Sequence, residues 1–176
     1  MDTTPFPSIR LLVLDVDGTL TDGAVYMGPN GEAMKAFSAQ DGLGLQMMAA
    51  AGVQVAIITG RSSGIVARRA AELAIPYVFQ GIMDKASCLR RLAAELAISL
   101  SEAAYMGDDL NDLPAMALCG MAACPANAAA DVRRRADFVA PHAGGQGAVR
   151  DFCEYYLRGA GLWASAARRR FGADLS

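Results

Sequence analysis

The sequence predicts an α/β fold, namely a Rossmann-like, doubly wound and mainly parallel sheet with helices on both faces. Six apolar runs of strand length alternate with stretches that carry helix start signals. The runs are continuously apolar, which is typical of parallel strands that are covered on both sides. One hairpin-like segment interrupts this alternation near the N-terminus.

The composition favours one globular domain over residues 1–176. The chain has 53% hydrophobic and 19% charged residues and a formal net charge of -2, which is neither disordered nor strongly basic in character. We therefore expect small molecules or further copies of the chain as partners, and neither nucleic acid nor membrane. No apolar run has the length of a membrane span, and residues 1–8 lack a basic and hydrophobic leader, so we expect a cytoplasmic protein. The four cysteines form no CxxC pair, and we expect buried reduced thiols.

The first strand is expected at residues 10–14, and the inserted hairpin follows at about residues 24–37. Its turn is the sequence Gly-Pro-Asn-Gly at residues 28–31. An isolated hairpin is only marginally stable, so we expect it to pack on its own sheet or on a neighbouring subunit.

Strands and helices then alternate towards the C-terminus. The later strands are expected at residues 53–58, 77–79, 103–106, 120–123 and 138–139. Three helices have expected N-caps: Asp41 for residues 42–51, Ser62 or Ser63 for residues 65–73, and Asp84 for residues 85–97. The tail, about residues 160–176, contains three consecutive arginines and is expected to be frayed and solvated.

Two of the expected strands end in acidic clusters. Asp15 and Asp17 follow the first strand, and the run Gly-Asp-Asp-Leu-Asn-Asp at residues 107–112 follows the strand at 103–106. Ionised carboxylates are costly to bury without partners, so packing gives no reason for them. Ligands of such folds bind beyond the carboxyl ends of the strands, and we expect a site there.

Two further strand ends carry groups that suit phosphate. Thr59 and Gly60 offer a hydroxyl and free backbone amides in front of a helix. Lys85 offers a point charge at the start of the next helix, and it is one of only two lysines in the chain. We therefore expect a phosphate-binding site beside the carboxylates.

Phosphate next to carboxylates requires a cation, because each pair of like charges a few ångströms apart repels by about 4 kcal/mol at an effective dielectric constant near 20. Asp15, Asp108 and a backbone carbonyl offer an all-oxygen ligand set that suits Mg²⁺, and we assign Asp15, Asp17 and Asp108 to the metal site. Asp15 can then attack phosphorus and form an aspartyl-phosphate that water later cleaves. Asp17 would protonate the leaving alcohol and activate that water, so the single histidine, His142, is not needed for proton transfer.

These motifs, in this order, resemble the four motifs of the haloacid dehalogenase superfamily of phosphohydrolases over nearly the whole chain. They are residues 15–21, residues 59–60, Lys85 and residues 107–112. The resemblance implies that Asp15 is the nucleophile and Asp17 the general acid/base, and that Thr59 and Lys85 bind the phosphoryl group. It also implies that Asp108 is the direct Mg²⁺ ligand of its motif, with Asp109 and Asp112 in support. The short spacing between the motifs implies the capless branch, which has no cap domain.

Among capless members, the chain resembles the phosphatases of 3-deoxy-D-manno-octulosonate 8-phosphate (KDO 8-phosphate), which serve lipopolysaccharide precursor synthesis. The similarity lies in residues 21–23, 30–32, 35–37, 41–44, 142 and 144–148. It implies a homotetramer in which the hairpin of one subunit helps to close the active site of the next. The implied substrate contacts, besides Asp17 and Lys85, are Ser38, Ala39, Gln40, Asp41, Gly42, Gln46, Gly60, Arg61 and Arg69.

The chain departs from these relatives at Ser38, Gln40 and Gln46, where they commonly carry basic residues. Because Gln does not replace a bidentate pair of Arg with a sugar carboxylate, a nine-carbon keto-sugar acid 9-phosphate is an alternative substrate. A catalytically idle oligomerisation module, related to domains of sugar-nucleotide synthetases, is a second alternative, which the intact carboxylates disfavour. A response-regulator receiver is disfavoured because its phosphoacceptor follows the third strand, whereas here the first strand carries Asp-x-Asp.

Overall fold

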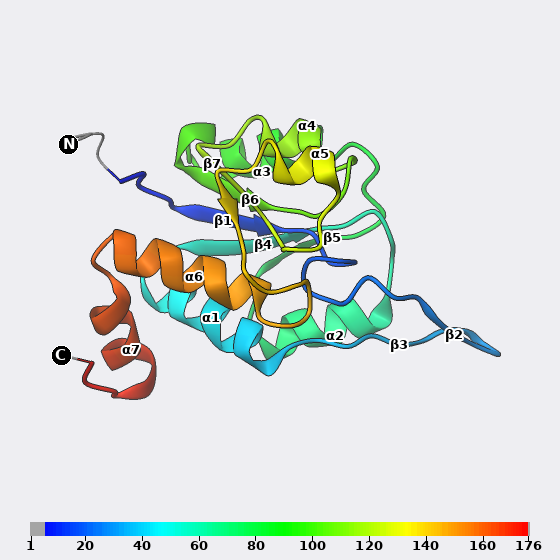
Figure 1. The fold of residues 1–176 in the computed structure, drawn as a ribbon, viewed down its shortest axis with the longest axis horizontal. Coiled ribbons are helices and arrows are strands. Elements are labelled where there is room, and N and C mark those ends of the chain that lie inside the picture. The colour runs from blue at the N-terminus through cyan, green and yellow to red at the C-terminus, as the bar shows by residue number, and fades with distance from the viewer. Residues whose placement is uncertain (1–5, 176) are drawn as a thin grey trace.

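The structure is a computed structural model that describes residues 6–175. Residues 1–5 and 176, which belong to the expected domain and tail, lie outside the described residues. Six strands form a parallel sheet in the order β5-β4-β1-β6-β7-β8, and β2 and β3 form a separate antiparallel hairpin (Figure 1). The expected parallel sheet with an inserted hairpin is therefore confirmed.

The strands of the large sheet lie close to their expected positions. They are β1 (Leu11–Leu14), β4 (Gln54–Ile58), β5 (Tyr77–Phe79), β6 (Ala103–Met106), β7 (Met121–Cys124) and β8 (Phe138–Val139). The chain builds β4 and β5 on one side of β1 and then crosses over to β6 on the other side. This is the strand order of a Rossmann fold, and the loops after β1 and β6 flank its switch point.

The helices are α1 (Ala39–Ala50), α2 (Gly64–Glu72), α3 (Lys85–Glu95), α4 (Leu113–Met116), α5 (Ala130–Arg133), α6 (Ala148–Gly159) and α7 (Trp163–Phe171). Ser63 and Asp84 cap α2 and α3 as expected. The expected cap of α1 is wrong, because Ser38 takes that place and its side chain accepts the N–H of Asp41. Asp41 itself lies in the first turn of the helix.

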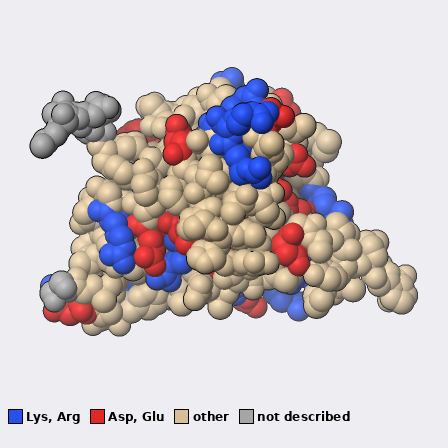
Figure 2. All heavy atoms as spheres, viewed as in Figure 1, with Lys and Arg blue, Asp and Glu red and all other residues tan. Residues whose placement is uncertain are grey.

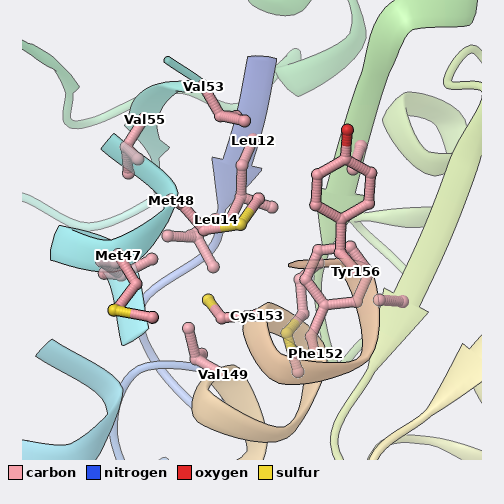
Figure 3. Close-up of a cluster of buried hydrophobic side chains, with 14 of the residues drawn as sticks. Leu12, Leu14, Met47, Met48, Val53, Val55, Val149, Phe152, Cys153 and Tyr156 are labelled. Carbon is pink, nitrogen blue, oxygen red and sulfur yellow. The ribbon is translucent and has the colours of Figure 1, made fainter. Parts of the chain in front are cut away.

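Alternation along β1 divides the core into two layers. Leu12 and Leu14 point to the face that is covered by α1, α2, α6 and α7, and Leu11 and Val13 to the face covered by α3, α4 and α5 (Figure 1). Figure 3 shows the first layer, in which Met48 of α1 and Phe152 of α6 meet the side chains of β1. Burial on both faces explains why the strands are continuously apolar.

The hairpin is shorter than the expected residues 24–37. β2 (Tyr26–Gly28) and β3 (Gly31–Met34) pair across a two-residue turn, with an irregularity between Tyr26 and Met27. At the base of the insert, Thr21 forms an isolated antiparallel bridge with Phe37. The hairpin therefore projects from the sheet close to the end of β1, as Figure 1 shows.

The expectation of a frayed tail is wrong. Helix α7 packs on α1, and its residues Ala166 and Ala167 are buried. The ring of Trp163 lies 4.4 Å from the guanidinium carbon of Arg158 and 5.3 Å from that of Arg150, both on α6. These cation–π contacts and apolar burial hold the tail against the domain.

Surface charges are mixed where Figure 2 shows them, with basic groups beside acidic ones. Arg134 and Arg135, for instance, both pair with Asp131. Three of the four free cysteines are buried, and Cys119 is partly buried. Within residues 6–175, no helix combines the length and the apolar character needed to cross a membrane.

Candidate active site

The site lies at the carboxyl ends of β1, β4 and β6. Because β1 pairs with both β4 and β6, the loops that follow these three strands lie side by side. Gly18, in the loop after β1, has a φ of +98°, and a Cβ there would lie 2.0 Å from Asp108 Oδ2. Only glycine therefore lets the loop after β1 approach Asp108 so closely.

Three carboxylates gather at these strand ends. Oxygens of Asp15, Asp108 and Asp112 lie within 4.8 Å of one another. Burial and the charge of Asp112 raise the pKa of Asp15 to about 6, although Lys85 opposes this shift. Burial, followed by the charges of Asp15 and Asp112, raises the pKa of Asp108 to about 8. The cluster thus holds more negative charge than its surroundings balance, and a divalent cation would relieve this repulsion.

Lys85 connects two of these carboxylates from the first residue of α3. Its Nζ donates to Asp15 Oδ1 and to Asp112 Oδ1, each at 2.6 Å, and its side chain is 1% exposed. Burial alone would lower the pKa of Lys85, but the two carboxylates raise it. The lysine is therefore a fixed positive charge beside the residue expected to be the nucleophile.

Asp112 organises the acidic loop after β6. Its Oδ2 accepts the backbone N–H groups of Asp108 and Asp109, at 3.1 and 3.3 Å. Its Oδ1 also accepts the hydroxyl of Tyr105, a fully buried residue of β6, at 3.0 Å. The sequence motif implies only a supporting role for Asp112 and none for Tyr105, because it does not show which acid of the run turns inward.

Asp17 lies apart from the three gathered carboxylates. Its Oδ1 accepts a hydrogen bond from Lys35 Nζ, and its Oδ2 lies 3.8 Å from Arg61 Nε. The carboxyl group of Asp17 therefore faces cations of the hairpin and of the loop after β4. The carboxyl group of Asp17 is therefore not among the gathered oxygens of Asp15, Asp108 and Asp112, although the sequence assigns Asp17 to the metal site.

The second motif follows β4 directly. Thr59 is buried, its N–H donates to the carbonyl of Phe79 at 2.9 Å, and its own carbonyl accepts the N–H of Ile82. Gly60 and Arg61 continue the loop in front of α2, and the side chain of Arg61 is half exposed. The predicted phosphate-binding hydroxyl thus stands on a backbone that β5 and the loop after it hold in place.

The predicted substrate contacts on α1 and α2 divide into two groups. Ser38, Ala39 and Gln40 lie at the N-terminal end of α1, followed by Gly42. Asp41 is buried and its Oδ1 accepts the N–H of Arg150 at 2.8 Å.

Gln46 and Arg69 form contacts within the fold. Gln46 Oε1 accepts from Arg170 of α7 at 2.9 Å. Arg69 donates to the carbonyl of Ser38 and to Glu72. The structure therefore does not bring Asp41, Gln46 and Arg69 to the acidic cluster, because other parts of the same chain hold their side chains.

A glycine loop before α6 braces the loop after β1. The N–H of Gly145 donates to the carbonyl of Thr19 at 3.2 Å, and a Cβ at Gly144 would lie 1.8 Å from the carbonyl oxygen of Gly18. His142, at the start of this loop, pairs with Asp151 on α6 at 2.8 Å. The loop thus supports the active-site backbone from behind, a part that sequence spacing alone does not disclose.

Comparisons with known proteins show the family of this chain. The haloacid dehalogenase-like hydrolase family matches residues 75–152. The 3-deoxy-D-manno-octulosonate 8-phosphate phosphatase of Salmonella typhi is 45% identical over 154 residues, which are 88% of this chain and 82% of that protein.

Two solved structures extend this similarity to the fold. The crystal structure of the enzyme of the same name from Moraxella catarrhalis, in complex with magnesium, phosphate and KDO, is 44% identical with a TM-score of 0.86, covering 90% of this chain and 92% of its own. A putative haloacid dehalogenase superfamily hydrolase from Legionella pneumophila has a TM-score of 0.91 at 36% identity, covering 95% of this chain and 92% of its own.

Proposed function

This chain belongs to the haloacid dehalogenase-like hydrolases, among the 3-deoxy-D-manno-octulosonate 8-phosphate phosphatases, and we propose that it hydrolyses KDO 8-phosphate to KDO and phosphate. The single observation that carries this proposal is the gathering of Asp15, Asp108 and Asp112, with one buried lysine bound to Asp15 and Asp112. A buried, over-charged acidic cluster of this kind suits a divalent cation and a phosphoryl group.

Magnesium is the cofactor of this reaction, and the donor set fits it. Asp15 and Asp108 would hold the ion, together with the backbone carbonyl of Asp17. When bound, Mg²⁺ supplies the positive charge that lets a phosphate dianion approach the carboxylates. The raised pKa values of Asp15 and Asp108 support this assignment, because they show that the ionised carboxylates lack the compensating positive charge that a bound cation would supply.

The other residues have proposed parts in two successive steps. Asp15 attacks phosphorus, and Thr59 and Lys85 hold the phosphoryl oxygens while the bond to the sugar breaks. Asp17, on the other side of the group, gives its proton to the leaving sugar oxygen. In the second step Asp17 takes a proton from the water that cleaves the aspartyl-phosphate. Arg61 stands at the exposed rim, where it is available to the sugar acid.

Phosphate release tests the proposal. We expect turnover of KDO 8-phosphate that is lost on chelation of Mg²⁺ and that exceeds turnover of a nine-carbon keto-sugar acid 9-phosphate. The variant Asp15→Asn should lower kcat by more than about 10³-fold, since it removes the nucleophile, whereas Asp131→Asn at the surface should not. No turnover of either sugar acid phosphate would overturn the proposal and favour the idle module, and preference for the nine-carbon substrate would favour the alternative phosphatase.

We propose further that the protein is a homotetramer whose hairpins complete neighbouring sites. The hairpin exposes apolar side chains, among them Met27 at 67% and Met34 at 53%, and such side chains usually seek a partner surface. Contacts of Gln46 and Arg69 with a substrate also belong to this proposal. Sedimentation tests it: a monomer, or a tetramer unaffected by Met27→Asp, would contradict the shared site. A cytoplasmic location is proposed as well, and the four free cysteines suit a reducing compartment.

A further inference from the structure

Lys35, the other of the two lysines, is buried but lies outside the acidic cluster. Its side chain is 1% exposed, although the residues of β2 and β3 before it are exposed or half-buried. A buried ammonium group is costly unless carboxylates compensate it. The contacts that compensate Lys35 therefore help to explain why the hairpin returns to the sheet.

Two carboxylates compensate Lys35. Its Nζ donates to Asp17 Oδ1 and lies 2.9 Å from Glu32 Oε1. Burial by itself would lower the pKa of Lys35, but the hydrogen bonds and charges of Asp17 and Glu32 raise it. The charge of Lys35 is thus compensated by one carboxylate of the hairpin and one of the loop after β1.

Glu32 fixes the other end of this arrangement on the loop after β4. Its Oε2 accepts the hydroxyl of Ser63, the N-cap of α2, and its Oε1 lies 3.4 Å from Arg61 Nη2. The hairpin is thus anchored at once to the loop after β1, through Asp17, and to the loop after β4, through Ser63. Lys35 lies between these two anchors and cannot shift without breaking one of them.

We propose that Lys35 is a positioning residue for Asp17, holding one oxygen of its carboxyl group so that the other faces the leaving group of the substrate. The contact of Arg61 with Oδ2, at 3.8 Å, is long enough to be replaced when a substrate enters. This inference rests on the proposed function, because it assumes that Asp17 transfers the proton.

Lys35 would support the transfer of a proton from Asp17 to the leaving sugar oxygen. The bond between phosphorus and the sugar oxygen breaks, its electron pair stays on that oxygen, and the proton of Asp17 moves there while phosphorus bonds to Asp15. Water then bonds to phosphorus, its proton returns to Asp17, and the bond to Asp15 breaks. A misplaced Asp17 impairs the first step only where the leaving oxygen needs a proton.

Leaving groups of different basicity test this proposal. A sugar alkoxide needs the proton, whereas p-nitrophenolate leaves without it, and kcat/KM reports the step in which the leaving group departs. We expect Lys35→Met to lower kcat/KM for KDO 8-phosphate by roughly 10²-fold. The loss for p-nitrophenyl phosphate should be at least about ten times smaller. Asp17→Asn should show about the same discrimination, meaning the ratio of its losses on the two substrates. Lys35→Arg should restore part of the loss. Arg134→Met, which removes a surface cation, should leave kcat/KM for both substrates unchanged.

Three results would overturn the proposal. Equal losses on both substrates in Lys35→Met would indicate a merely structural lysine. A crystal structure of Lys35→Met with the carboxyl group of Asp17 unmoved would do the same without depending on any substrate. If Asp17→Asn discriminates between the two substrates and Lys35→Met does not, the role of Lys35 alone is contradicted. If Asp17→Asn does not discriminate either, the proposed function itself is contradicted, and with it the basis of this inference.

Discussion

Asp112 receives hydrogen bonds from two sides of the active site. Lys85 and Tyr105 donate to its Oδ1, and the backbone of residues 108 and 109 donates to its Oδ2. Because a single carboxylate satisfies all four donors, it fixes both the acidic loop and the lysine that faces Asp15. Hydrogen bonds to a buried charged group are stronger than those between neutral groups.

The hydroxyl of Tyr105 should therefore contribute to stability. Tyr105→Phe keeps the buried ring but removes one donor to Asp112, and we expect the free energy of unfolding to fall by about 1.5 kcal/mol. Urea denaturation followed by circular dichroism measures this. Tyr155→Phe is a matched control, because Tyr155 is an exposed tyrosine whose ring stacks on Phe138 in either form. Equal stability of the two variants would show that Tyr105 does not hold Asp112.

At this scale the sequence predicted the kinds of residue in the site better than their contacts. The two acidic strand ends marked Asp15 and Asp108, which the structure brings together. The sequence does not show that Lys35 turns inward, because the hairpin around it is exposed and its spacing to Asp17 follows no regular period. Such contacts depend on how the chain returns to the sheet, which is a long-range property.

Among the elements, α6 begins in an unusual way. Its N-cap is Gly147, which has a φ of +113° and no side chain to accept the first N–H groups. Asp41 from α1 performs this function, with its Oδ1 accepting the N–H of Arg150. A carboxylate at a helix N-terminus also interacts favourably with the helix dipole.

Removal of this cap should destabilise the layer that α6 completes. We expect Asp41→Ala to lower the free energy of unfolding by about 2 kcal/mol, since buried N–H groups lose their acceptor. Asp41→Asn keeps an acceptor and should lose less. Urea denaturation of both variants tests this, with Asp131→Ala as the control, an exposed acid in the first turn of α5. A loss in Asp131→Ala as large as in Asp41→Ala would contradict the capping role.

The predicted N-cap of α1 is wrong because the side chain of Asp41 caps α6 instead. Asp41 is a good N-cap by residue type, but Ser38 lies closer to the turn, and α6 draws the carboxylate of Asp41 away. The prediction for the tail is wrong because its helix is rich in arginine. Three arginines indicate a solvent-exposed segment, whereas Trp163 and the small residues Ala166 and Ala167 provide the buried face. Local sequence propensity does not predict contacts with partners from distant parts of the chain.

For the whole molecule, the strand order explains why motifs so far apart in sequence form one site. Placing β1 between β4 and β6 brings Asp15, Thr59 and Asp108 to one edge of the sheet. Alternating apolar strands and helices predict a parallel sheet with a site beyond its strand ends, whereas the order of the strands comes from the structure. The same arrangement concentrates negative charge, and this affects the stability of the entire fold.

That charge makes stability depend on pH and on Mg²⁺. The pKa of Asp15 is raised to about 6 and that of Asp108 to about 8, so the folded metal-free protein binds protons more tightly than the unfolded chain. Their contribution to stability is fully present at a pH below the unfolded pKa of 3.8 and is lost as the pH rises through about 6 and about 8. Mg²⁺ replaces these protons, so it should stabilise the fold most where they have been lost.

We therefore expect Mg²⁺ to raise Tm more at about pH 8 than at about pH 6, relative to the protein in chelator at the same pH. At a concentration of 100 times its Kd, the ion would add about 2.7 kcal/mol. Thermal unfolding in both buffers measures the shift. Asp108→Asn should abolish it, whereas Asp174→Asn, a change in the exposed tail, should preserve it. An equal or smaller shift at the higher pH would mean that the cation does not replace protons in this cluster, because protonation and Mg²⁺ binding would then involve different groups.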